Sequence, residues 1–145
     1  MADAQIPSDP SASPEATAAR PSRAQAFREA VFELIRLDGV RGGLIVTPDG
    51  LVITSELPPR FPVEALAALA ATLGRELELG ATRLERGAFR TALFAADDGT
   101  VFVGGSPVGY LTLVADRNVN AEAVRAALGR SVDRLGGTWR NTGAA

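Results

Sequence analysis

One stretch of the chain has the residue types of a catalytic loop, namely Gly104-Gly105-Ser106-Pro107-Val108-Gly109. It could be read as a phosphate cradle or as a turn that exposes a nucleophilic serine. A phosphate-binding loop ends in Gly-Lys-Ser/Thr, and a serine elbow joins a strand to a helix, and neither feature occurs here. A turn between two strands explains this stretch more simply.

The side chains most often used in catalysis are missing from the 145-residue sequence, which contains no Cys, no His and no Lys. Without Cys there is no disulfide, thiol nucleophile or zinc thiolate, and without His there is no imidazole base or ligand. All 15 basic residues are Arg, which excludes Schiff-base chemistry and the lysine of a phosphate loop. Paired carboxylates stay open for acid/base work, but no pair has a distinctive context. We therefore expect no enzyme activity, metal or cofactor.

The charge of the chain is nearly balanced, with a formal net charge of -2. This argues against electrostatic attraction to nucleic acid or to an acidic membrane surface. The N-terminal stretch lacks the basic start and apolar run of a secretory signal, and the most apolar helix carries charged groups, so we expect no membrane insertion. The default expectation is a cytoplasmic protein.

A helix predicted over residues 61–79 is the element around which the others must be arranged. Large apolar residues recur along it at helical spacing, and small ones occupy its opposite side: Leu66, Leu69, Ala70, Leu73 and Leu77, then Val63, Ala67, Ala68 and Ala71. A helix that is apolar on more than one side is expected to be buried against other elements on more than one side. We expect one side to pack on the chain's own sheet and the other to meet a second copy or a partner. The alternative is that its alanines merely tolerate water.

The remaining pattern predicts a single domain over residues 22–136, between a disordered tail at 1–21 and a flexible tail at 137–145. Ser22 and Gln25 form a capping-box pattern before a first helix that ends near Gly39. A hairpin is centred on Pro48-Asp49-Gly50, with its first strand apolar enough to be covered on both faces. Further strands are predicted at 89–95, 100–104 and 109–115. The last helix follows Asn120 and ends at Gly136-Gly137.

This order of helix, two strands, helix, three strands and helix resembles the Roadblock/LC7 family, and more closely its bacterial MglB-like branch. The resemblance covers roughly residues 23–135. It is carried by the hairpin Gly43-Leu44-Ile45-Val46-Thr47-Pro48-Asp49-Gly50-Leu51-Val52-Ile53, by the Leu/Ala helix, and by Gly109-Tyr110-Leu111-Thr112-Leu113-Val114-Ala115-Asp116 with Asn118 and Asn120.

The resemblance implies an α+β fold, an α/β/α sandwich. In it, a five-stranded antiparallel sheet carries the first and last helices on one face and the middle helix on the other. It also implies a dimer with itself or with a related Roadblock subunit, in which the middle helices pack antiparallel and the third strands pair edge to edge. The implied dimer-interface residues are Val63, Leu66, Ala67, Ala70, Leu73, Leu77, Phe89 and Thr91.

The family resemblance further implies a non-enzymatic scaffold that binds a small Ras-like GTPase and modulates its GTPase cycle. GTPase stimulation often places an arginine at the developing phosphate charge, and the loop arginines open to that role are Arg41, Arg60, Arg86 and Arg117. The candidates for contact with the GTPase are Arg41, Arg60, Glu64 and Arg75. The alternative is a small-ligand sensor domain of a signalling system, with a pocket between sheet and helix.

Overall fold

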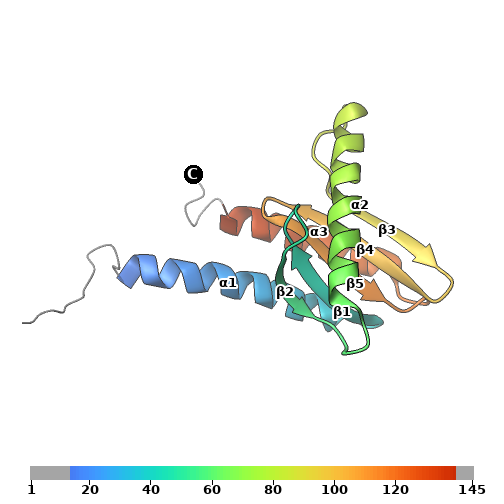
Figure 1. The fold of residues 1–145 in the computed structure, drawn as a ribbon, viewed down its shortest axis with the longest axis horizontal. Coiled ribbons are helices and arrows are strands. Elements are labelled where there is room, and N and C mark those ends of the chain that lie inside the picture. Colours follow the sequence, from blue (N-terminus) through green and yellow to red (C-terminus); the bar gives the residue numbers. More distant parts are fainter. Residues whose placement is uncertain (1–13, 140–145) are drawn as a thin grey trace, which may run out of the picture.

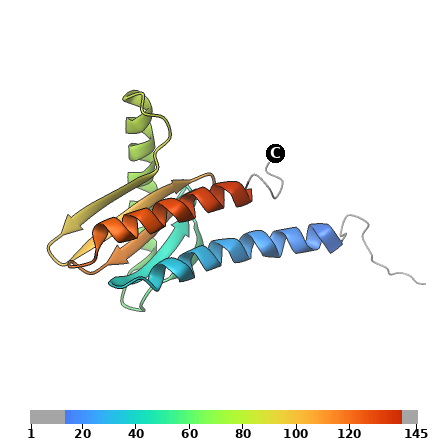
Figure 2. The same ribbon diagram turned by 180° about the vertical axis from the view of Figure 1, so that it is seen from behind.

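The computed structural model describes the backbone of residues 14–139 and the side chains of residues 24–137. The elements in chain order are α1 (Pro14–Ile35), β1 (Val40–Val46), β2 (Val52–Glu56), α2 (Val63–Arg83), β3 (Thr91–Ala96), β4 (Gly99–Ser106), β5 (Gly109–Ala115) and α3 (Ala121–Trp139). The five strands form one sheet in the order β2-β1-β5-β4-β3, and all neighbours are antiparallel. Helices α1 and α3 cover one face and α2 crosses the other (Figures 1 and 2). The predicted fold class is confirmed.

The α1 and α3 face holds the larger core. Phe27, Val31 and Leu34 of α1 and Val124 and Leu128 of α3 are buried against the sheet. The central strands are covered on both faces, as predicted for the first strand of the hairpin, and every residue of β1 except Arg41 is buried. No helix among the described residues is both long enough and apolar enough to cross a bilayer.

Helix α2 approaches the sheet through small residues. Ala67, Ala70 and Ala71 are at most 2% exposed. A Cβ atom on Gly74 would lie 2.5 Å from Cδ1 of Tyr110, so the tyrosine ring fills the space that a side chain would need. The Tyr110 hydroxyl, which lies beneath α2, donates a 2.7 Å hydrogen bond to Oε1 of Glu78. Shape and hydrogen bonding therefore fix α2 on β5.

Helix ends account for most differences from the sequence-based expectations. Helix α1 begins at Pro14, so Ser22 lies inside it and is no cap, and Gln25 donates to Glu29 instead. Proline suits the first helical position, and the residues that follow Pro14 include good helix formers, which extends α1 into the predicted tail. The predicted tails at 1–21 and 137–145 are helical over 14–21 and 137–139. Their remaining residues lie outside the described part.

Two helices continue past the glycines at which the sequence pattern predicted that they would end. Helix α2 continues through Gly80 to Arg83, and α3 continues through Gly136 and Gly137 to Trp139, because a glycine inside a helix costs only about 1 kcal/mol. After α2 the backbone takes positive φ at Glu85 and Gly87 instead. The predicted turn at residues 104–107 is also displaced: Gly104 and Gly105 belong to β4 and the turn lies at Pro107 and Val108.

Other local predictions are confirmed. The backbone N–H of Ala123 donates to Oδ1 of Asn120 at 3.1 Å, which caps α3. Gly50 adopts a φ of +93°, as a tight hairpin requires. Helix α1, however, ends at Ile35, before the predicted end near Gly39, and Gly39 (φ +88°) lies in the turn that the hydrogen bond from the Val40 N–H to the Leu37 carbonyl closes.

Replacing Tyr110 by Phe should remove the hydrogen bond to Glu78 and keep the ring beneath Gly74. We expect the free energy of unfolding at pH 7 to fall by about 0.5–1.5 kcal/mol, measured by urea unfolding.

The pH dependence of the same variant separates the hydroxyl from the ring. Burial, followed by the Glu78 hydrogen bond, raises the pKa of Tyr110 above its ordinary value of 10.0. The neutral hydroxyl therefore stabilises the folded state below about pH 10, and this contribution is lost as the pH rises further. At pH 11 the wild type should lose about 1.4 kcal/mol that Tyr110→Phe does not lose. Equal losses in both proteins would contradict this assignment.

Gly74→Ala should destabilise the subunit by about 1–3 kcal/mol, because its Cβ atom would overlap the Tyr110 ring. Gly137→Ala is the matched control, since no atom lies within 4 Å of a Cβ at that helical position. The control should be neutral or up to about 1 kcal/mol more stable. Thermal unfolding of both variants, followed by circular dichroism, tests the difference.

Candidate functional site

The leucines of α2 lie beside its contact with the sheet. On one side of the helix, Ala71 lies near Gly50 and Arg75 donates to the Pro48 carbonyl, so this side faces the β1–β2 turn. The leucines occupy the other side, toward β4 and β3. Leu66 and Leu73 pack partly against the core beneath α2, and Leu69 is 46% exposed.

Strand β3 continues this apolar area at the edge of the sheet. Phe94 is paired with Val101, so both lie on the face that α2 crosses, and Phe94 is 40% exposed. We name Leu66, Leu69, Leu73, Phe94 and Val101 the α2–β3 surface.

The outer backbone groups of β3 have no partner strand among the described residues. The strand reads Thr-Ala-Leu-Phe-Ala-Ala, and its six register pairs with β4 contain no bulge. Natural sheet edges usually carry charges, prolines or bulges that prevent pairing with another chain. None of these protects β3, so this edge is suited to pairing.

The residues implied as a dimer interface divide into three groups. Ala67 and Ala70 are each 1% exposed against their own sheet, so these two have no surface left for a partner. Thr91 is paired with Gly104 and lies close to Gly129, which places it on the α3 face of the edge strand. The others remain half-buried and accessible, namely Val63, Leu66, Leu73, Leu77 and Phe89.

Two exposed residues of this surface were missing from the implied interface. Leu69 belongs to the leucine stripe that the sequence pattern identifies, so the spacing alone could have included it. Phe94 could be assigned only once the pairing of β3 with β4 was known, because a shift of one residue would move it to the other face.

A charged groove lies at the end of the sheet near the start of α2. Arg41 and Arg60 line this 620 Å³ groove together with Asp97, Asp98 and Asp116. The Nε atom of Arg41 donates to both carboxylate oxygens of Asp116 at 2.9 and 3.0 Å. This hydrogen bonding lowers the pKa of Asp116 from its ordinary value. The groove therefore presents charges of both signs, with Arg41 and Asp116 paired, rather than one cationic pocket.

The GTPase-contact candidates occupy different environments. The Arg60 guanidinium lies 5.5 Å from the centroid of the Phe61 ring, and Glu64 is exposed in the first turn of α2. The structure brings Arg41 and Arg60 to one groove but places Arg75 elsewhere, where it holds the β1–β2 turn. Arg86 and Arg117 are exposed in loops.

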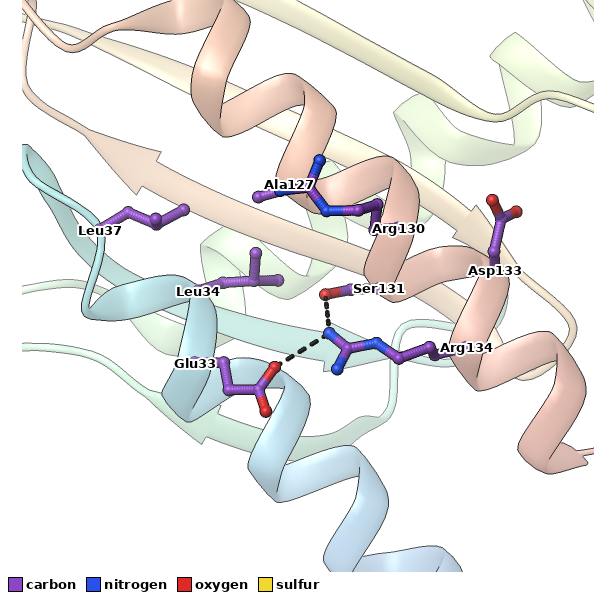
Figure 3. Close-up of a pocket in the computed structure, with 8 residues that line it drawn as sticks. All are labelled: Glu33, Leu34, Leu37, Ala127, Arg130, Ser131, Asp133 and Arg134. Atoms are coloured by element: carbon purple, nitrogen blue, oxygen red, sulfur yellow. Dashed lines mark hydrogen bonds and ion pairs between the residues drawn. The ribbon is translucent and has the colours of Figure 1, made fainter.

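A second groove, of 570 Å³, lies between α1 and α3 (Figure 3). Nη2 of Arg134 donates to Oε1 of Glu33 at 2.9 Å and to Oγ of Ser131 at 3.1 Å. Leu34 and Leu37 lie on the α1 side, and Ala127 faces them from α3. The polar groups here join the two helices to one another. Among the described residues, no cluster of three or more acidic side chains could hold a metal ion.

Similar proteins share this architecture. Three curated relatives from Methanocaldococcus jannaschii are uncharacterized; two are 27% and 28% identical over 105 residues, which is 72% of this chain and 92% and 89% of theirs. MglB of Myxococcus xanthus has a TM-score of 0.73 at 14% identity, covering 84% of this chain and 93% of that chain. The gliding protein MglB from Thermus thermophilus has a TM-score of 0.70 at 19% identity, covering 83% and 93%.

A Roadblock/LC7 domain from Streptomyces avermitilis also shares the fold, with a TM-score of 0.63 at 22% identity over 78% of this chain and 93% of that chain. The family model of the Roadblock/LC7 domain matches residues 27–115, from α1 to the last residue of β5. This match spans more than half of the sequence, and the chain therefore belongs to the Roadblock/LC7 domain family.

Proposed function

We propose that this protein is a non-enzymatic dimeric scaffold that binds a small Ras-like GTPase and modulates its GTPase cycle. The observation that carries the proposal is the α2–β3 surface, which lies uncovered in the single subunit beside an edge strand suited to pairing. The family resemblance supports the GTPase as the second partner. The absence of Cys, His and Lys from the sequence agrees with regulation by contact rather than by catalysis.

The energetic argument favours a second copy as the first partner. Leu69 and Phe94 are 46% and 40% exposed, so covering each contributes roughly 1 kcal/mol, or about half of full burial. A twofold dimer counts each contribution twice. Pairing the two β3 edges would add backbone hydrogen bonds and remove two exposed sheet edges.

The charged groove is the proposed GTPase-facing region. It adjoins the α2–β3 surface through Val101, which lines the groove as well. Of its two arginines, Arg60 is the better candidate for approaching a phosphate. The Arg41 guanidinium is already engaged by Asp116, whereas Arg60 lies on a loop beside Phe61.

The alternative function, a small-ligand sensor, has less support. A ligand pocket usually offers a few polar groups that converge on a bound molecule. In the α1–α3 groove, the Arg134 guanidinium instead bonds to Glu33 and Ser131. A specific rise in the melting temperature with one nucleotide or metabolite would reverse this preference.

Leu69→Glu should weaken the dimer, because it would bury a carboxylate against the apolar area of the partner. Leu51→Glu is the matched control, since Leu51 is 68% exposed beside β2, at the opposite edge of the sheet. Light scattering coupled to size-exclusion chromatography should give a dimer mass for the wild type and the control at micromolar concentration. It should give a monomer mass for Leu69→Glu. A monomeric wild type would overturn the dimer.

Binding to a GTPase should depend on the bound nucleotide. The dimer should bind a small Ras-like GTPase in its GTP-loaded state and change the rate at which that GTPase hydrolyses GTP. If Arg60 reaches the phosphate, Arg60→Ala should reduce this change in rate at least about tenfold. Leu51→Glu should behave as wild type. Equal binding of the GTP- and GDP-loaded states, with turnover unchanged, would reject the GTPase assignment and leave the dimer intact.

A further inference from the structure

Gly80 lies inside α2 without an explanation in its own subunit. A Cβ atom at this position would meet no atom within 4 Å, and an interior glycine makes a helix about 0.5–1 kcal/mol less stable than alanine does. Figure 1 shows the C-terminal part of α2, where Gly80 lies, rising beyond the sheet. Gly74 differs in this respect, because the Tyr110 ring occupies the space that a side chain at position 74 would need.

The position of Gly80 on the helix is specific. Leu66, Leu73 and Gly80 follow one another at intervals of seven residues, and a seven-residue step returns to nearly the same side of an α-helix. Gly80 therefore continues the leucine side of α2. Gly80 therefore leaves a gap at its own position in a row whose other members, Leu66 and Leu73, carry bulky side chains.

The row is symmetric about Leu73. Leu66 lies seven residues before it and Gly80 seven after, while Leu69 lies four before and Leu77 four after. Leu73 is also the midpoint of α2, with ten residues of the helix on either side. An antiparallel copy related by a twofold axis at Leu73 would therefore overlap the full helix and place Leu66 of each copy opposite Gly80 of the other.

We infer that Gly80 is the socket for Leu66 of a second copy, and that this contact sets the register of the α2 pair. The inference rests on the proposed dimer and adds to it which residues meet. The second copy is the occupant that fits best, because the midpoint between Leu66 and Gly80 coincides with the midpoint of α2, so that pairing them also overlaps the two helices along their full length. A parallel copy would place leucine against leucine and glycine against glycine. The antiparallel arrangement also aligns the two helix dipoles favourably.

The test compares where a new leucine is placed on α2. Gly80→Leu fills the socket, whereas Ala68→Leu adds the same side chain at an exposed position away from the leucine row. The double variant Leu66→Ala/Gly80→Leu exchanges protrusion and gap. The dimer dissociation constant is measured by analytical ultracentrifugation, and circular dichroism reports the fold of each variant.

We expect Gly80→Leu to raise the dissociation constant by about tenfold or more, since overpacking occurs at both symmetric contacts. Ala68→Leu should stay within about twofold of wild type, and the double variant should recover most of the loss. Gly80→Ala, which improves the isolated helix and adds one methyl group, should also weaken the dimer, and it keeps the test decisive if Gly80→Leu does not fold.

The outcomes separate a failure of the proposed dimer from a failure of the Gly80–Leu66 contact. A wild-type protein that stays monomeric would overturn the proposed dimer and the socket together. A wild-type dimer that tolerates Gly80→Leu and Gly80→Ala would overturn the socket alone. A loss with Gly80→Leu that the exchange variant does not recover would overturn the pairing of Gly80 with Leu66.

Discussion

The close approach of α2 to the sheet constrains the rest of this molecule. Ala67, Ala70, Ala71 and Gly74 let the helix lie directly over Tyr110, whose hydroxyl is held by Glu78. Because the small residues take this contact, Leu66 and Leu73 pack only at its side and Leu69 remains largely exposed. They are displaced toward β3, where the sheet ends without a protecting charge, proline or bulge. The same packing that stabilises the subunit therefore creates the α2–β3 surface.

The two faces of the sheet differ in what they contribute to the molecule. On the α1 and α3 face, the larger core and the Glu33–Arg134 ion pair hold two helices together. On the other face, a single helix leaves apolar surface at its side and a charged groove beyond its start. This asymmetry supports the proposed scaffold role, since one face supplies stability and the other leaves apolar and charged surface exposed. The oppositely charged residues of the groove favour selective recognition of a protein surface over general attraction to anions.

Sequence patterns were sufficient for the order of elements, the buried central strand, the cap at Asn120 and the turn at Gly50, because each depends on local periodicity or turn chemistry. Helix ends were less predictable, since Gly80 and Gly136-Gly137 permit a break without forcing one. The interface was predictable only in part. Spacing identified the leucine row, but which side of α2 meets the sheet depends on Tyr110, a residue 36 positions after Gly74. That contact buries Ala67 and Ala70, which the implied interface had included.

Hydrogen exchange of the two edge strands tests the central claim, that a second copy covers α2 and β3, most directly. The account predicts that backbone amides of β3 (Thr91–Ala96) become more protected as the protein concentration rises, whereas those of β2 (Val52–Glu56), at the opposite edge, do not change. Protection that is independent of concentration in both strands, in a protein whose mass is that of a monomer, would contradict it.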